Sequence, residues 1–253
     1  MGMMVLEAEL PLVPQLCDPR KTSIDIGAAA GIYTVHMLKV SRDVIAFEPR
    51  PSQAAELSRM FESLGAPVRV ESVALSNRAG VSQMRMLIKD RGRSTIEAAN
   101  SLDDEDGSAE VQVAVQVRKL DDFGLVEIGF IKIDVEGHEL AVLEGARDTI
   151  LRSLPIILVE SEERHRKGAV ADITTFLRQL GYSGFFLLDG TLCPLDRFDP
   201  ALHQDARNIG GWKQGWERRG TYVNNFLFVP IGREAVLTEA VDKNLQHNLK
   251  HKR

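Results

Sequence analysis

Short apolar runs alternate with amphipathic stretches along most of this chain. Runs that are apolar at nearly every position are typical of strands buried on both faces of a sheet. Between them, apolar residues recur every three or four positions, which predicts helices with one buried face. The strand-like runs lie at 23–26, 44–47, 68–75, 128–133, 156–159, 185–188 and 226–229, of which 23–26, 68–75 and 128–133 also contain polar residues. The helical patterns lie at 33–40, 51–64, 137–151 and 169–180. This alternation predicts an α/β fold with a doubly wound, mostly parallel sheet.

One stretch departs from the alternation. Val81–Ile88 and Val111–Val117 both have strand-like composition, and the second run alternates valine with other residues. Two such runs predict an antiparallel β-hairpin inserted into the α/β pattern. The segment between them contains the acidic run Asp103–Asp106, interpreted as a solvated loop or, alternatively, as a lid over a substrate. The late strands predict an antiparallel finish, so that seven strands form the main sheet.

The same pattern predicts three parts of the chain. Residues 1–22 contain three prolines and no sustained period, so we expect a lead-in segment that covers part of a ligand site or the sheet edge. Residues 23–231 are predicted to form a single domain, in which 80–118 are the hairpin insertion. Residues 232–253 are predicted to form a helix with an apolar stripe from Leu237 to Leu249 and a basic tail. This helix either covers the sheet edge or docks onto a second copy in a homodimer.

The stretch Ser23–Thr34 predicts a nucleotide site, because it combines a strand that breaks at Gly27 with a helix after Gly31. Three alanines separate these glycines, so the glycine that lets a backbone approach a pyrophosphate is missing. Asp25 precedes the turn, and its carboxylate attracts cations such as the ammonium and sulfonium groups of S-adenosylmethionine. Glu48 ends the next predicted strand, 23 residues after Asp25, where related sheets place a ribose-binding acid.

These residues favour S-adenosylmethionine as the cofactor. Its adenine is expected beside the end of the third strand, which makes Val73 and Ala74 adenine neighbours. An NAD(P)-dependent oxidoreductase is the enzymatic alternative, and the missing glycine opposes it. A noncatalytic module that keeps the fold and the cofactor is an alternative from another class.

Composition narrows the class of partner. The chain has 253 residues, of which 44% are hydrophobic and 26% charged, and a net charge of −5. These values fit one soluble domain and disfavour a nucleic-acid polymer as the main partner. The apolar runs are too short for a membrane span. The N-terminus lacks the pattern of a signal peptide, so we expect the cytoplasm. The two cysteines, Cys17 and Cys193, lack a metal-binding spacing, and no metal site is predicted.

Between Ser23 and Glu160, the order and combination of motifs resemble the FkbM-type methyltransferases. These enzymes use S-adenosylmethionine and typically methylate hydroxyl oxygens on sugars or related natural products. The matching segments are Asp25–Ala28 with Gly31, Tyr33 and Thr34, then Phe47–Pro49, Ala74–Ser76 with Gly80, Ile131–Glu139, Val142–Ala146 and Pro155–Glu160. Beyond Glu160 the resemblance is loose, so it does not identify the acceptor.

The resemblance implies a Rossmann-like class I methyltransferase fold with an antiparallel last strand. It places the cofactor against Asp25, Gly27, Ala28, Gly31, Tyr33, Thr34, Glu48 and Asp134. The family often has Asn where Ala30 stands, so a side-chain contact to the methionine part of the cofactor is missing here.

Three polar residues at predicted strand ends are catalytic candidates. Methyl transfer to a hydroxyl is an in-line displacement that benefits from a general base. His138 is the predicted base, because an imidazole is largely neutral at pH 7. Asp134 is predicted to position the methionine amino group or the acceptor hydroxyl. Glu160 is predicted to orient the acceptor or His138.

The predicted activity is O-methylation of a hydroxyl on a sugar or a glycosylated small molecule. The strand that ends at Asp134 lacks the Asn/Asp-Pro-Pro-aromatic turn of many amino-group methyltransferases, which opposes a nitrogen target. Mg²⁺ held by Asp134 and Glu160 is a rival mechanism that we do not predict. Trp212 and Trp216 belong to an aromatic, basic stretch from Gly210 to Tyr222, interpreted as a substrate loop or as a structural loop.

Overall fold

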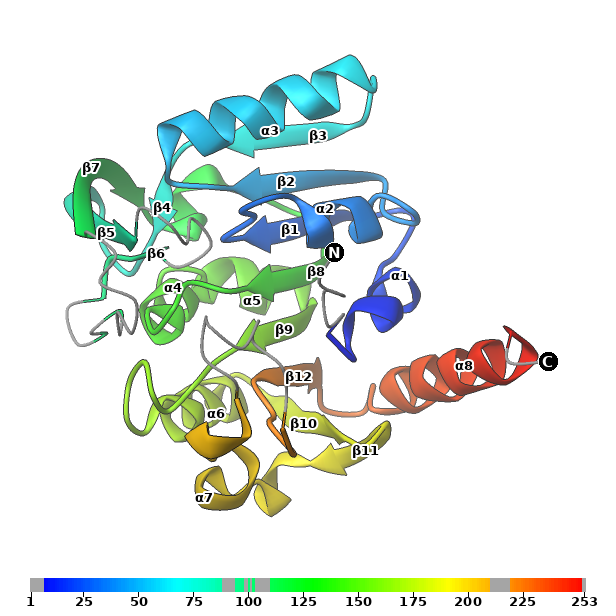
Figure 1. The fold of residues 1–253 in the computed structure, drawn as a ribbon. Helices are drawn as coiled ribbons and strands as arrows, with labels where there is room; N and C mark the ends of the chain where they lie inside the picture. The colour runs from blue at the N-terminus through cyan, green and yellow to red at the C-terminus, as the bar shows by residue number, and fades with distance from the viewer. Residues whose placement is uncertain are drawn as a thin grey trace.

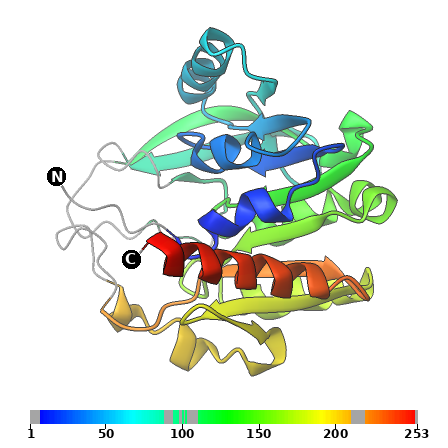
Figure 2. The ribbon, with the colours of Figure 1, turned by 90° about the vertical axis from the view of Figure 1, so that its right-hand side faces the viewer.

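The computed structural model describes residues 7–87, 94–97, 100, 102, 110–209 and 219–251, with the backbone alone described from 247 onward. Within these residues the chain forms a main sheet of eight strands and a second sheet of four strands (Figure 1). Helices cover both faces of the main sheet (Figure 2). The doubly wound α/β fold predicted from the sequence is therefore confirmed.

The main sheet has the strand order β11-β10-β12-β9-β8-β1-β2-β3. Its strands are β1 (Thr22–Ile26), β2 (Asp43–Phe47), β3 (Val68–Glu71), β8 (Ile128–Ile133), β9 (Ile156–Glu160), β10 (Tyr182–Leu188), β11 (Thr191–Pro194) and β12 (Asn225–Pro230). Neighbours from β3 to β9 pair in parallel, whereas β12 is antiparallel to both β9 and β10, as the late strands predict. The chain order reverses between β1 and β8, where ligands bind in open sheets of this kind.

The eighth strand, β11, corrects the prediction of seven strands. Asp189 and Gly190 both have positive φ, at 49° and 78°, and join Leu188 to its partner Thr191. A two-residue Asp-Gly turn with this conformation matches the twist of a β-hairpin. The sequence therefore contained the signal for this strand, but the weak alternation of the four residues after the turn hid it.

The predicted third strand is divided between the two sheets. β3 ends at Glu71, and β4 (Ala74–Leu75) joins the second sheet, whose order is β4-β7-β5-β6. The predicted hairpin is confirmed: β5 (Gly80–Leu87) and β7 (Glu110–Arg118) pair in antiparallel fashion, and β6 (Ser94–Thr95) pairs with β5. The acidic run Asp103–Asp106 lies outside the described residues.

Two apolar layers attach the helices to the sheet. One face carries α1 (Val13–Leu16), α2 (Ile32–Met37), α3 (Pro51–Ser63) and α8 (Ala235–His251), and the other carries α4 (Glu139–Glu144), α5 (Arg147–Ser153) and α6 (Ala169–Gln179). The remaining short helices are η1 (Leu10–Leu12), η2 (Leu120–Phe123), η3 (Leu195–Arg197), α7 (Pro200–His203) and η4 (Ala206–Asn208). Successive residues of a central strand face opposite layers, as Val44 and Ile45 do. Both faces of these strands are therefore buried, which explains why their sequences are apolar at consecutive positions.

The helix predicted at 137–151 is in fact two helices, α4 and α5, which separate at Gly145. A Cβ at Gly145 would lie 2.0 Å from the carbonyl oxygen of Ser76, so the chain approaches β4 more closely than any side chain permits. The Gly145 carbonyl accepts a hydrogen bond from the Asp121 backbone N–H. Tertiary contact thus overrides a helical pattern that continues on both sides.

The C-terminal helix α8 lies along the face that carries α1, as Figure 2 shows. Leu237 and Val241 are buried in that apolar layer, whereas Leu245 is 47% exposed. The predicted stripe therefore covers the main domain over its first half only. In the part of the chain that the structure describes, every helix is too short or too polar to cross a membrane.

Candidate active site

Two clefts open at the carboxyl ends of β1, β2 and β8. The first has about 610 Å³ of empty space, part of it open solvent, and its walls include Phe47, Glu48, Val73, Ala74, Leu75 and Met84. The second has about 650 Å³, also partly open, and its walls include Glu7, Asp25, Ala28, Tyr33 and Lys132. Gly27, Ala29 and Asp134 line both clefts, so the two spaces meet beside the β1–α2 turn.

The two glycines of the β1–α2 turn serve different contacts. Gly27 has a φ of 82°, and a Cβ there would lie 1.8 Å from the carbonyl oxygen of Asp134. Because Gly27 has no side chain, the ends of β1 and β8 can lie in contact. Gly31 has a φ of 78° and would place a Cβ 2.8 Å from Leu57 of α3. Gly31 lines neither cleft, so in this structure it serves helix packing rather than approach to a ligand.

Asp25 is almost completely buried, with 1% of its surface exposed. Burial raises the pKa of this carboxyl group to about 6, although a hydrogen bond from the Thr34 hydroxyl and the charge of Lys132 lower it. Thr34 Oγ1 donates to Asp25 Oδ2 over 2.6 Å. Thr34 itself is buried and lines neither cleft, so any contribution that it makes to ligand binding passes through Asp25.

Glu48 lies at the end of β2 in the first cleft, together with Val73 and Ala74. Its Oε1 accepts hydrogen bonds from the backbone N–H and from Nε of Arg50, at 2.9 and 2.7 Å. Its Oε2 accepts from Arg50 Nη2 and from the Ala29 backbone N–H, each at 3.0 Å. A ribose at this position must therefore share these oxygens with Arg50 or displace it.

The loop that follows β8 is held by the hairpin insertion. Glu136 has a φ of 52°, which is unfavourable for a residue with a side chain. Its carbonyl oxygen accepts hydrogen bonds from Thr95 Oγ1 at 2.9 Å and from Asn100 Nδ2 at 2.8 Å. Thr95 also lines the first cleft. The insertion thus forms part of the cleft wall and holds the loop in this conformation.

His138 precedes α4 and lines the first cleft, but both of its ring nitrogens have partners. Nε2 lies 2.9 Å from Ser76 Oγ, and Nδ1 lies 3.2 Å from Glu97 Oε2. A carboxylate can only accept, so the Glu97 contact places a proton on Nδ1, while Nε2 is occupied by the Ser76 hydroxyl. The predicted base therefore has no ring nitrogen available to an acceptor while these contacts last.

Lys132 is the central charge of the site. Its ammonium is 1% exposed and lies 3.1 Å from Asn225 Oδ1 and 3.5 Å from Glu160 Oε2. Burial raises the pKa of Asp134 to about 7 and that of Glu160 well above its ordinary value, while Lys132 lowers both. The sequence prediction did not assign Lys132, although a lysine within the apolar run of β8 is a signal, because a buried ammonium requires partners.

A magnesium ion between Asp134 and Glu160 gains no support. Lys132 already provides a positive charge beside Glu160. No three His, Cys, Asp or Glu side chains gather as a metal-binding group within the described ranges.

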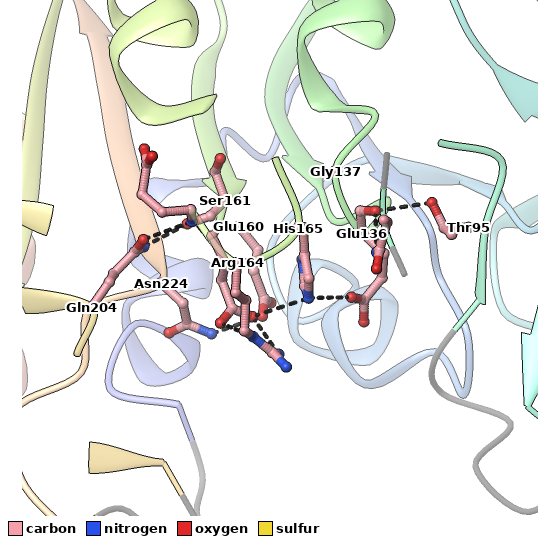
Figure 3. A network of polar contacts seen from close by, with 12 residues as sticks. Thr95, Glu136, Gly137, Glu160, Ser161, Arg164, His165, Gln204 and Asn224 are labelled. Carbon is pink, nitrogen blue, oxygen red and sulfur yellow. Dashed lines mark hydrogen bonds and ion pairs between the residues drawn. The ribbon is translucent and has the colours of Figure 1, made fainter. Parts of the chain in front are cut away.

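A polar network extends from Glu136 to the loops after β9 and before β12 (Figure 3). His165 Nε2 lies 2.9 Å from Glu136 Oε2, without the alignment of a hydrogen bond, and 3.9 Å from Glu162 Oε1. Burial alone would lower the pKa of His165, but these carboxylates outweigh it and raise the pKa. Glu162 also pairs with Arg164 at 2.7 Å and accepts from the Tyr222 hydroxyl. His165 thereby links the loop after β8 to the loop after β9.

Glu160 belongs to the same region but lines neither cleft. Its Oε1 accepts from Asn224 Nδ2 at 2.7 Å, and Figure 3 shows the two side chains next to each other. Asn224 was not identified from the sequence, because its partner Glu160 lies 64 residues away along the chain. The contact of His165 with Glu136, which belongs to another loop, is likewise absent from any local pattern. Trp212 and Trp216 lie outside the described residues.

Comparison with known proteins identifies the family of this chain. Residues 25–183 match the family model described as the Methyltransferase FkbM domain. Methyltransferase 1 of Beauveria bassiana (strain ARSEF 2860) is 26% identical over 179 residues, which cover 63% of this chain and 71% of that protein. Methyltransferase sdnD of Sordaria araneosa is 29% identical over 171 residues, which cover 55% of this chain and 66% of that protein.

Among solved structures, the Methyltransferase FkbM from Methylobacillus flagellatus KT superposes with a TM-score of 0.52 and 16% sequence identity. The match covers 83% of this chain but only 44% of that one, so the likeness concerns the fold and less than half of the solved protein. The family model, in contrast, spans most of the present chain, from the strand that contains Asp25 to β10. The chain therefore belongs to the FkbM methyltransferase family.

Proposed function

We propose that this protein is an S-adenosylmethionine-dependent O-methyltransferase that acts on a hydroxyl group of an uncharged sugar or glycosylated small molecule. One observation carries the proposal: two clefts of different character meet at Asp134. The first has Glu48 and several apolar residues in its walls, and the second contains several carboxyl groups. S-adenosylmethionine likewise has a flat, largely apolar adenine at one end and a charged methionine part at the other. When bound, it supplies a methyl group made electrophilic by the positively charged sulfur.

The first cleft suits the adenosine end. Phe47, Val73 and Met84 offer apolar surface to a flat base, and burial of that surface favours binding. Glu48 supplies carboxylate oxygens for ribose hydroxyl groups, with Arg50 and the Ala29 N–H holding the carboxylate in place. This assignment supports the roles predicted for Glu48, Val73 and Ala74.

The second cleft suits the methionine end. Asp25 and Asp134 present carboxyl groups to a ligand that carries an ammonium and a sulfonium charge. Tyr33 and Ala28 form the wall on the side of α2. Ala30 also lines this cleft, and its methyl group offers no hydrogen bond, as the resemblance to the family implies.

Asp134 is the base that the geometry favours. It lies where the clefts meet, and a carboxyl group with a pKa of about 7 can accept a proton near neutral pH and release it again. Lys132 and Glu160 lie behind it and can compensate the charge that changes on Asp134. His138 is retained as the alternative base, but it requires the acceptor hydroxyl to take the place of the Ser76 hydroxyl.

The charges around the acceptor side favour an uncharged acceptor. Glu136, Glu160 and Glu162 lie in the loops and strand ends next to Asp134 and pair with His165, Lys132 and Arg164, respectively. With Asp134 included, the acids of this region outnumber these basic partners. Carboxylates in such a cluster repel phosphate and carboxylate groups. The same repulsion disfavours a nucleic-acid backbone. Carboxylate and amide groups, such as Asn224 beside Glu160, can also exchange hydrogen bonds with sugar hydroxyls.

Two titrations and an acceptor screen test this function. In calorimetry, S-adenosylhomocysteine is expected to bind in the micromolar range, with and without chelator, and NAD is expected not to bind. Neutral sugars and glycosides are then incubated with S-adenosylmethionine, and mass spectrometry identifies the methylated atom. Phosphorylated forms of the same acceptors serve as matched controls and should not react. Failure of S-adenosylhomocysteine to bind would refute the cofactor, and binding without turnover of any hydroxyl acceptor would favour the noncatalytic alternative.

A further inference from the structure

The N-terminal segment contributes a carboxylate to the second cleft. Glu7 and Leu10 line this cleft, although they precede β1 and lie outside the residues that match the family model. Leu10 and Leu12 are buried, and the Leu10 backbone N–H donates to the Glu7 carbonyl at 3.2 Å. This helical turn anchors the segment and fixes where Glu7 lies.

Two side chains from other elements hold the Glu7 carboxylate. Its Oε2 accepts hydrogen bonds from the Tyr33 hydroxyl of α2 and from Asn225 Nδ2 of β12, the latter at 3.1 Å. Asn225 Oδ1 in turn accepts from Lys132 at 3.1 Å. The Asn225 amide therefore hydrogen-bonds to both the buried Lys132 ammonium and the Glu7 carboxylate, which faces the cleft. A carboxylate with two fixed donors on one oxygen has lone pairs on the other oxygen for a ligand.

The charge balance of the cleft calls for a cation. Of the described residues that line it, three are acidic and one is basic, namely Glu7, Asp25, Asp134 and Lys132. Lys132 already interacts with Glu160 and Asn225 at the base of the site. Asp25 also lines this cleft, but only 1% of its surface is exposed and its Oδ2 accepts a hydrogen bond from the Thr34 hydroxyl. Glu7 and Asp134 are both only partly buried. Because Asp134 is the proposed base where the two clefts meet, Glu7 is the acid that remains to meet a ligand cation.

We propose that Glu7 is a cofactor-binding residue: its carboxylate pairs with the α-amino group of the methionine end of the cofactor, and the segment Glu7–Leu10 closes this end of the second cleft. Tyr33 and Asn225 are positioning residues that orient the carboxylate. The inference rests on the proposed function, because it takes S-adenosylmethionine as the ligand. It adds a contact that the sequence motifs do not contain.

The test compares two ligands that differ only in the part that Glu7 would contact. S-adenosylhomocysteine has the amino-acid part, whereas 5′-methylthioadenosine keeps the adenosine and the sulfur but lacks it. In calorimetry, Glu7→Gln should weaken the affinity for S-adenosylhomocysteine by about 10- to 100-fold, because it removes a charge-assisted hydrogen bond. Affinity for 5′-methylthioadenosine should change by less than about twofold. Glu62→Gln, an exposed glutamate on α3, is the control and should affect neither ligand.

The possible outcomes separate this inference from the proposed function. An equal loss of affinity for both ligands, or no loss for either, would overturn the role of Glu7 while leaving the cofactor assignment intact. If the wild-type protein binds neither ligand, both proposals fail. Tyr33→Phe provides a second reading, since it removes one donor to Glu7 and leaves the acid in place. It should weaken the affinity for S-adenosylhomocysteine by about threefold and leave the affinity for 5′-methylthioadenosine unchanged.

Discussion

The two sides of the site are built from contacts of very different range along the chain. On the side formed by β1 and β2, polar groups bind partners close in sequence, as Thr34 does with Asp25, nine residues away. On the side formed by β8 and β9, partners come from remote segments, as Asn224 does with Glu160, 64 residues away. The first side is thus specified within one motif, whereas the second exists only after the whole domain has assembled.

This difference assigns separate tasks to the two sides. A short motif that folds with its own contacts can preserve a cofactor site while the rest of the chain changes. The remote contacts, such as Ser76 with His138 and Glu160 with Asn224, tie the acceptor side to segments outside that motif. We therefore expect substitutions on the β1–β2 side to act first on cofactor affinity and those on the β8–β9 side to act first on turnover.

The largest effect is expected at Gly27, where the two sides touch. Gly27→Ala places a Cβ 1.8 Å from the Asp134 carbonyl oxygen and requires alanine to adopt a φ of 82°. Overpacking and the left-handed backbone together should lower the free energy of unfolding by roughly 3–5 kcal/mol and abolish binding of S-adenosylhomocysteine. Urea denaturation and calorimetry measure the two effects.

Gly65→Ala is the matched control for this substitution. Gly65 also has a positive φ, 59°, but a Cβ there meets no atom within 4 Å. It should cost only about 1–2 kcal/mol, from the backbone alone, and spare the cofactor. Equal losses of stability in the two variants would show that the contact between Gly27 and Asp134 has no energetic weight, and the two sides would then be independent.

The next effect is expected at Asp134, on the side with remote contacts. Asp134→Asn removes the proposed base, so kcat should fall by about 10²- to 10⁴-fold, while the affinity for S-adenosylhomocysteine changes by less than about tenfold. In the wild-type protein kcat should rise with pH through about 7, because only the ionised carboxylate can accept the proton. This dependence should disappear in the variant.

His138→Gln tests the alternative base in the same assay. Glutamine can still bind Ser76 or Glu97, so a residue that only holds the loop should lose less than about tenfold in kcat and keep the pH profile. A loss of 10²-fold or more, together with a normal Asp134→Asn enzyme, would transfer the role of base to His138.

The fold could be predicted because its signals are local. Buried parallel strands show as apolar runs, and the hairpin insertion shows as two runs without a helix between them. Predictions were wrong where a tertiary contact decided the structure. Gly145 divides a continuous helical pattern because the chain must pass Ser76, and the strand after Val68 divides because its end joins another sheet.

The candidate site shows the same limit. Asp25, Gly27 and Glu48 were identified from spacing along the chain, and they line the two clefts together with Asp134. Glu7 could not be identified, because nothing near it in sequence indicates that it reaches α2 and β12. The pairing of a remote residue depends on the register of the assembled sheet, which a local pattern does not determine.

The last effect is expected at Asp25, and it has opposite signs for stability and for binding. The folded-state pKa of about 6 lies above the unfolded value of 3.8, so the folded protein holds this proton more tightly. The associated stability is complete below pH 3.8 and is lost as the pH rises through 6. Asp25→Asn keeps an acceptor for Thr34 but removes the cost of burying the charge. Its free energy of unfolding should therefore equal that of the wild type near pH 3 and exceed it by roughly 3 kcal/mol at pH 7.5.

The gain in stability should accompany a loss of cofactor affinity, because the amide no longer attracts the ammonium and sulfonium charges. Urea denaturation at the two pH values and calorimetry with S-adenosylhomocysteine at pH 7.5 measure both. If Asp25→Asn stabilises the protein without weakening the cofactor, Asp25 is a structural residue that the motif merely contains. The attraction for the cation would then come from the remote acids Glu7 and Asp134. The expectation that the β1–β2 side determines cofactor affinity would be wrong for Asp25.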